Sequence, residues 1–247
     1  MEQGANCPQS IERPRLAGWR ILVYAKYGSE RESTSMKLEF VFDFEATKAA
    51  LLYLASKHLP DFDKYKVCKL LFLADREHLL RFGRTITGDS YHALPYGPTP
   101  SETLNLLDGL EAVVIEGNEP ANEKVDDLVH SLRLTDVRYP QYEPQADADM
   151  DSLSESDIWI LDQIAGEHGT KGFAELKALT HGLAAYTRAW QENGVGKKFR
   201  MSFEDFFAET PERAGFLKEI AEKQFLTRLF PGPPECSTAT ASNRSMS

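Results

Sequence analysis

The feature that most constrains the fold is an apolar run from Val67 to Ala74, which only Lys69 interrupts. The run lies in a segment from Tyr65 to Phe82 that has the length of a long helix, and Gly83 follows as a suitable residue for ending it. A helix that is apolar on nearly every side must be buried over most of its surface. We therefore expect this segment to be the central helix of an α-helical core.

Most of the chain between residues 43 and 230 favours further helices, because polar capping residues precede segments with apolar residues at helical spacing. The predicted helices are 43–57 with Asp43 as N-cap, a short helix opened by a Thr99, Pro100 and Glu102 capping box and ended by Gly109, one opened by Ser154 and Asp157, Phe173–His181, one ending near Trp190, and one opened by Thr210 and Pro211 that ends near Phe230. Two strands, Val113–Ile115 and Leu128–Leu134, are expected to form a ribbon. The predicted fold class is mainly α, a compact helical domain with a small β-hairpin or ribbon.

A polar block, Asp75 to His78, interrupts the apolar pattern of the central helix. One interpretation is pairing along the helix, between Asp75 and His78 and between Glu77 and Arg81, with each pair contributing about 0.2–0.5 kcal/mol. The other is that Asp75 is a partly buried carboxylate, which then needs hydrogen-bond donors from the segment after the helix. The candidate donors are Arg84, Tyr91 and Tyr96.

That following segment, Arg84 to Pro98, is rich in glycine and proline, so we expect a loop or a short hairpin there. If Asp75 anchors it, the segment is held rigidly on the core and is suited to recognition. Tyr91 and Tyr96 then have two possible roles, which are contact with a partner or packing of the segment onto the helices.

Composition excludes several functional classes. The chain has 247 residues and a formal net charge of −10, whereas a duplex-binding protein needs a basic face. No run of 18 apolar residues is present, so a transmembrane helix is not expected. Three scattered cysteines do not form a disulfide framework, and we expect a cytoplasmic protein. Twelve acidic residues between Glu116 and Asp157 predict a solvated linker at about 140–153 with its flanks, or else an acidic surface for a basic partner.

The chain is expected to consist of one domain at residues 36–230, with a variable extension at 1–35 and a disordered tail at 231–247. The tail contains few large apolar side chains and cannot form a core. Arg20 splits the apolar run in the extension, so the run is too short for a secretory signal.

No pattern typical of catalysis or metal binding is present. The aspartates in residues 147–151 resemble the start of a calcium loop, but the required glycine and glutamate are missing. Cys68 and His78 would lie about 15 Å apart along a helix axis, too far for a nucleophile and its base. We therefore expect a protein that is not an enzyme and that has no cofactor and no metal.

A resemblance to a known family extends from Lys69 to Ser101, over the sequence KLLFLADREHLLRFGRTITGDSYHALPYGPTPS. The residues that carry it are Lys69-Leu70-Leu71, Ala74-Asp75, His78, Gly83, Ile86-Thr87-Gly88-Asp89, Tyr91, Tyr96-Gly97-Pro98 and Pro100. In this order they resemble the Panacea domain, the SocA-type antitoxin domain that is also found in GepA-like phage-associated proteins. A looser similarity continues through the helices to His181 and Trp190.

The resemblance implies an antitoxin of a bacterial or phage-borne toxin–antitoxin system. Such a protein neutralises a cognate toxin by direct protein contact, either alone or as an adaptor that delivers the toxin to a ClpXP-type protease. The family offers no catalytic residues to transfer to this chain. The candidate residues for binding the toxin are Asp75, His78, Arg84, Asp89, Tyr91, Tyr96, Gly97 and Pro98.

The main alternative is a DNA-binding transcriptional regulator with a winged-helix-like fold. Residues 154–190 would form the helix–turn–helix, and the two predicted strands would form the wing. Lys177 and Arg188 would be the main basic residues on its helices, and few cations are then available for phosphate contacts. An enzyme of unrecognised type is a third interpretation, which a perturbed Asp75 or a ligand-binding cleft would favour.

Overall fold

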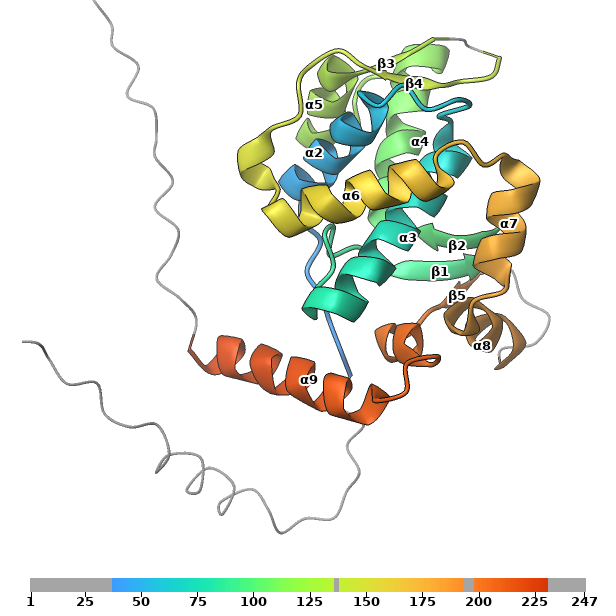
Figure 1. Cartoon of the computed structure of the whole chain (residues 1–247). Helices are drawn as coiled ribbons and strands as arrows, with labels where there is room; N and C mark the ends of the chain where they lie inside the picture. Colours follow the sequence, from blue (N-terminus) through green and yellow to red (C-terminus); the bar gives the residue numbers. More distant parts are fainter. Residues whose placement is uncertain (1–36, 136–137, 193–197, 231–247) are drawn as a thin grey trace, which may run out of the picture. The chain divides into compact units, whose positions relative to one another are not determined.

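The computed structural model describes residues 37–135, 138–192 and 198–230, and it confirms a mainly α-helical fold (Figure 1). The helices are α2 (Phe44–Ala55), α3 (Lys64–Phe82), α4 (Ser101–Glu116), α5 (Glu123–Ser131), α6 (Glu155–His168), α7 (Phe173–His181), α8 (Ala184–Glu192) and α9 (Arg213–Leu229). The strands are β1 (Tyr91–Leu94), β2 (Gly97–Pro100), β3 (Leu132–Leu134), β4 (Tyr142–Pro144) and β5 (Phe199–Arg200). Two 3₁₀ turns span Met150–Ser152 and Phe203–Phe207.

The chain divides between Ser35 and Met36 into two units, and all described residues belong to the second. The predicted extension at 1–35, the predicted tail at 231–247, Cys7 and Cys236 lie outside the described residues. No helix in the described part is long and apolar enough to cross a membrane.

Helix α3 is the central helix, as its apolar pattern predicts. It packs against α4, α6, α7 and the β1–β2 hairpin, and residues Val67 to Asp75 are all buried (Figure 1). Asp63 caps its first turn by accepting a hydrogen bond from the Lys66 backbone N–H at 2.8 Å. Gly83 ends it in the left-handed conformation, with φ of 73°. The predicted bounds are therefore confirmed to within one residue.

The segment after α3 contains a hairpin, which settles the choice between a loop and a hairpin. Strands β1 and β2 pair antiparallel, with Tyr91 opposite Pro100 and Leu94 opposite Gly97. Strand β5 pairs with the other edge of β1, so the sheet has the order β2-β1-β5. Residues 84–90 connect α3 to this sheet without regular structure.

The predicted end of the helix at Gly109 is wrong. Helix α4 continues through Gly109 and through Val113–Ile115, which were expected to form a strand, and it ends at Gly117 with φ of 74°. A Cβ atom at Gly109 would lie only 2.9 Å from a methyl group of Val125. Gly109 therefore permits close packing of α5 on α4 rather than ending a helix.

The predicted strand Leu128–Leu134 is mostly wrong as well, because its first half belongs to α5. Only Leu132–Leu134 forms a strand, which pairs with β4 inside the acidic segment. The predicted linker at 140–153 thus contains a strand and a 3₁₀ turn, and Tyr142 within it is buried. In the DNA-binding alternative these two predicted strands form the wing. The structure has α4 in place of the first strand and α5 in place of the first half of the second, so the wing is not formed there.

The start signals of the helices have mixed outcomes. Ser154 and Asp157 form the predicted capping box of α6, and α7 has its predicted bounds. The predicted Thr99 cap is wrong, because Thr99 and Pro100 belong to β2 and α4 begins at Ser101. The last helix begins at Arg213 after an N-cap residue that makes no side-chain bond, so the Thr210–Pro211 start is also wrong.

Candidate partner-binding surface

Asp75 lies fully buried on α3 and holds the segment that follows the helix. Its Oδ1 accepts hydrogen bonds from the backbone N–H groups of Ile86 (2.7 Å) and Thr87 (3.0 Å). Its Oδ2 accepts from the hydroxyls of Thr87 and of Tyr91, the latter at 2.7 Å. Burial raises the pKa of the Asp75 carboxyl, and the hydrogen bonds from Thr87 and Tyr91 oppose that rise. The carboxylate is therefore the anchor of the 84–91 segment.

This geometry decides between the two interpretations of Asp75. The predicted pairing of Asp75 with His78 is wrong, whereas the Glu77–Arg81 pair is formed. Of the three predicted donors only Tyr91 is confirmed, because Arg84 pairs with another carboxylate and the Tyr96 side chain is exposed.

Asp89 is a second buried carboxylate. It precedes β1, and it caps α4, which follows β2. Its Oδ1 accepts from the backbone N–H groups of Ser101 and Glu102, both at 3.0 Å. Its Oδ2 accepts from the N–H and the hydroxyl of Thr103, both at 2.8 Å. Asp89 thus satisfies the open donors of the first turn and complements the positive end of the helix dipole.

His78 and Arg84 connect the end of α3 to the start of α6. His78 Nδ1 donates to the Arg84 carbonyl at 2.9 Å, since a carbonyl oxygen can only accept. His78 Nε2 lies 2.9 Å from Oδ1 of Asp157 and 3.0 Å from the Ser156 hydroxyl. The Arg84 guanidinium lies 2.8 Å from the same Asp157 oxygen. Burial alone would raise the pKa of Asp157, but hydrogen bonds from His78, Arg84 and Ser154 hold that pKa far below its ordinary value.

Lys69 supports the turn of the hairpin from beneath. Its ammonium group donates a 2.6 Å hydrogen bond to the Pro98 carbonyl and lies 4.8 Å from the centre of the Tyr65 ring. Burial lowers the pKa of Lys69 to about 8. Gly97 has φ of 103°, and a Cβ there would lie 3.2 Å from Cε of Lys69. Only glycine allows the turn to close over the lysine without strain.

Next to this support lies a set of three rings, which we call the aromatic surface and define as the exposed Tyr96 and Phe173 with the half-buried Tyr65. Tyr96 at the hairpin turn is 61% exposed and Phe173 at the start of α7 is 51% exposed. The centres of their rings are 5.9 Å apart, and Phe173 lies 4.4 Å from the Tyr65 ring. The Lys177 ammonium lies 5.4 Å from the Tyr96 ring, within range of a cation–π contact.

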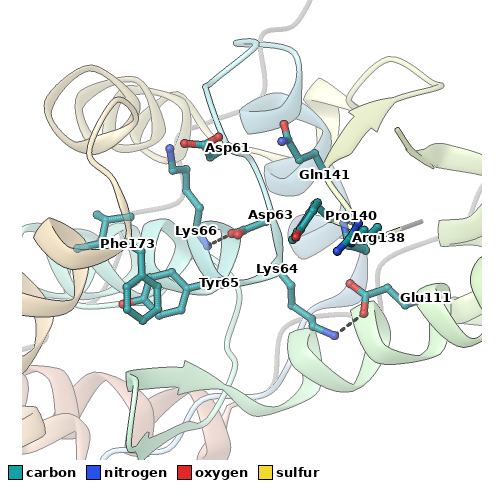
Figure 2. A pocket seen from close by; sticks show the side chains of 12 residues that line it. Asp61, Asp63, Lys64, Tyr65, Lys66, Glu111, Arg138, Pro140, Gln141 and Phe173 are labelled. Carbon is teal, nitrogen blue, oxygen red and sulfur yellow. Dashed lines mark hydrogen bonds and ion pairs between the residues drawn. The ribbon is translucent and has the colours of Figure 1, made fainter. Parts of the chain in front are cut away.

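A cavity of about 650 Å³ adjoins the aromatic surface (Figure 2). Tyr65 and Phe173 form one side of it, and Glu111 lies on the opposite side with residues 138–141 of the β3–β4 connection (Figure 2). Lys64 crosses toward Glu111 and forms ion pairs with Glu111 and Asp108. The charges of these three residues are thus already paired. Asp61, Asp63, Lys66 and Arg138 also line the cavity, so it offers charged groups as well as aromatic area.

The eight predicted site residues separate into supports and exposed groups. The buried supports are Asp75, His78, Asp89, Tyr91, Gly97 and Pro98. Tyr96 is exposed, and the Arg84 side chain is 42% exposed. Direct contact of any of the eight with a toxin stays a prediction. Tyr96 and Arg84 are favoured for that role because their side chains are exposed.

Sequence reasoning missed Phe173 and Tyr65 on the aromatic surface, as well as the role of Lys69. The signals for Lys69 were its position as the single break in the apolar run and its place at the start of the family-like motif. Phe173 gives no local signal, because its relation to the hairpin depends on how α7 packs on α3 and β2.

The described residues give little support for catalysis or metal binding. Among them, no group of three or more His, Cys, Asp or Glu side chains could hold a metal ion. Cys68 is a free, buried thiol, and burial raises its pKa to about 12, so it is a poor nucleophile at neutral pH.

Comparison with known proteins confirms the family resemblance. A family model described as antitoxin SocA-like, Panacea domain, matches residues 67–187. The match begins in α3 and ends in α8, so it includes both anchoring carboxylates, the hairpin and α7. No curated protein and no solved structure gives a significant match to the chain.

Proposed function

Because residues 67–187 place this chain in the antitoxin SocA-like Panacea family, we propose that it neutralises a toxin protein by binding it directly through the aromatic surface. In this proposal the protein is a cytoplasmic, non-enzymatic binding partner of its toxin. The hairpin turn and the start of α7 supply the contacts, and the adjoining cavity accepts a side chain of the toxin.

The observation that carries the proposal is a pair of exposed rings on a rigid support. Tyr96 and Phe173 present aromatic area that the fold does not cover. Lys69 holds the hairpin close to its turn, and Asp75 and Asp89 hold the segments that enter and leave the hairpin. Large aromatic side chains are enriched among residues that dominate binding energy, and a rigid support reduces the entropy lost on binding.

The DNA-binding alternative has less support. Lys177, the cation expected on its recognition helix, lies over the Tyr96 and Phe173 rings. Arg188 forms an ion pair with Asp205. Both cations thus already have partners within the fold, whereas tight DNA binding needs several cations that face phosphates.

Growth rescue tests the proposal. The reading frame beside this gene would be expressed from an inducible promoter, alone, with the full chain, and with residues 36–230. We expect the neighbouring product to be toxic and both forms of this chain to relieve the toxicity. A harmless neighbour, or toxicity that persists with the full chain, would contradict the antitoxin function.

The surface itself is tested with Tyr96→Ala, and Phe225→Ala serves as the control because Phe225 is an aromatic residue on α9 that is 50% exposed, against 61% for Tyr96. We expect Tyr96→Ala to weaken toxin binding by about tenfold or more, as for a residue at the centre of an interface, with an unchanged Tm. Rescue by Tyr96→Ala equal to that by Phe225→Ala at matched expression would place the contact elsewhere.

Measuring the toxin's half-life during rescue separates the two routes of neutralisation. A stable toxin that is recovered in complex with this chain indicates occlusion. A toxin that disappears faster when this chain is present, and only when a ClpXP-type protease is active, indicates delivery to that protease.

A further inference from the structure

Lys69 is a buried cation that lacks a counter-ion among the described residues. Lys69 is only 1% exposed. The neighbours of its ammonium group are the Pro98 carbonyl and the Tyr65 ring, which are both neutral. Lys48 and Lys64, by contrast, each form ion pairs with carboxylates. A desolvated ammonium is costly unless an opposite charge or several hydrogen bonds compensate it. One of its three donors is used for the Pro98 carbonyl.

Two further polar atoms beside Lys69 have no hydrogen-bond partner within the described ranges. They are the Tyr65 hydroxyl and Nε2 of His181, and both atoms are buried. The Tyr65 ring lies against the Lys69 ammonium, and His181 meets Lys69 at Gly97, where a Cβ would lie 3.2 Å from the lysine Cε and 3.3 Å from Cδ2 of His181. Buried polar groups of this kind are normally satisfied, so their gathering at one place points to a bound group.

The ionisable groups that face this cluster are Asp63, Tyr65 and Cys68 at the start of α3, His181 and Lys177 from α7, and Tyr186 from α8. Asp63 is the carboxylate among them, and its Oδ1 already accepts a hydrogen bond from the Lys66 backbone N–H, whereas Lys69 and Lys177 are both cations. Burial raises the pKa of Tyr65 to about 12 and that of Cys68 to about 12, so both stay neutral. A cation as ligand would be repelled, and an anion would be attracted.

From this geometry we infer that the polar side chains beneath the hairpin turn form a binding site for a carboxylate, with Lys69 as its counter-ion and Tyr65 and His181 as further donors. A carboxylate is a planar anion whose two oxygens accept about four hydrogen bonds. It therefore matches two free ammonium donors, one hydroxyl and one imidazole N–H, and the ion pair is strong because water is excluded.

The hairpin turn covers this site. Pro95 and Tyr96 at its tip are exposed, whereas Gly97 is buried against Lys69. The Tyr186 hydroxyl donates a 2.9 Å hydrogen bond to the Leu94 carbonyl and closes the other end of the turn.

Two sources supply the same chemistry. One is a free small carboxylic acid. The other is an acidic side chain of the protein partner, inserted beside Tyr96, and this source rests on the proposed function.

Nuclear magnetic resonance of the full chain labelled with ¹³C at lysine Cε tests the site, with sodium acetate as the probe and sodium chloride at equal ionic strength as the reference. We expect acetate to shift the Lys69 signal saturably and to move its titration midpoint upward from about 8 by roughly one pH unit, because a bound anion stabilises the ammonium form. Acetate affinity should then fall as the pH rises above about 8, where the free lysine loses its proton. A Lys69 signal that behaves identically in acetate and in chloride would overturn the proposal.

Two variants make the assignment specific. Lys69→Met keeps the length of the side chain without its charge and should abolish the response, which we would follow at His181. Lys218→Met removes an exposed cation on α9, away from the site, and should leave the Lys69 response intact. If Lys69→Met does not fold, the signal can be assigned by its through-space contacts to Gly97 and Tyr65, and the comparison in the wild-type chain still decides.

Adding the toxin separates the two sources. If the Lys69 midpoint rises in the complex and acetate then has no effect, an acidic side chain of the toxin fills the site. If Lys69 is unchanged and still responds to acetate, the site takes a free acid while toxin binding at the aromatic surface stands. A toxin that does not bind contradicts the proposed function, and the acetate comparison still decides whether the site exists.

Discussion

Asp75 illustrates how one buried carboxylate can organise the chain beyond the end of its own helix. It receives donors from Ile86, Thr87 and Tyr91, which lie 11 to 16 residues further along the chain. Each donor would be left unsatisfied in an apolar environment if the carboxylate were removed. Asp75 thus links the end of α3 to the start of the hairpin by hydrogen bonds within the fold.

We predict that Asp75→Leu destabilises the protein by at least about 3 kcal/mol, because each buried donor left without a partner costs about 1–3 kcal/mol. Urea unfolding measures the loss. Asp147→Leu, at an exposed position in the acidic segment, adds the same apolar side chain and should leave stability nearly unchanged. An unaltered midpoint for Asp75→Leu would refute the anchoring role.

At the scale of elements, the sequence predicted best those helices whose signals are local. The ends of α3 and the capping box of α6 depend on residues within a few positions of the helix, and both predictions are confirmed. Helix α4 was predicted poorly because its determinants are distant in the chain. Its cap is Asp89, more than ten residues before Ser101, and Gly109 reflects the approach of α5 rather than a helix end.

The two possible caps of α4 can be compared directly. We predict that Asp89→Ala destabilises the protein by about 2 kcal/mol or more, since it removes a cap that is also buried. Thr99→Val should cost less than about 1 kcal/mol, because the Thr99 hydroxyl makes one 3.2 Å bond to the Gly97 carbonyl. Thermal unfolding of both variants checks the order, and a larger loss for Thr99→Val would restore the capping box that the sequence suggested.

At the scale of the whole molecule, the family-like motif allowed most of the buried supporting residues of the candidate site to be predicted, but few of the exposed ones. Tyr96 was predicted because it lies inside the motif, whereas Phe173 could not be, since helix packing alone brings it to the hairpin. The motif residues are mainly buried polar groups and turn residues. These residues build the scaffold, so under the proposed function we expect exposed positions such as Tyr96 and Phe173 to determine which toxin is bound.

The contact between the end of α3 and the start of α6 makes the stability of the whole fold depend on pH. The pKa of Asp157 is depressed in the folded state by His78, Arg84 and Ser154, so the folded protein holds this carboxyl in its charged form more strongly than the unfolded chain does. The stabilisation is fully present above the unfolded pKa of about 4 and is lost as the pH falls through the folded pKa.

We predict that Asp157→Asn lowers the free energy of unfolding at pH 7 by about 2 kcal/mol or more, and that this difference from the wild type shrinks between about pH 5 and pH 2. The control is Asp162→Asn, because a hydrogen bond from Lys57 also lowers the pKa of Asp162, yet that pair is exposed and screened by solvent. Its loss should stay below about 1 kcal/mol at every pH. Urea unfolding across this pH range measures both variants. A difference in the free energy of unfolding between Asp157→Asn and the wild type that does not change with pH would show that the charge of Asp157 does not stabilise the contact between the two helices.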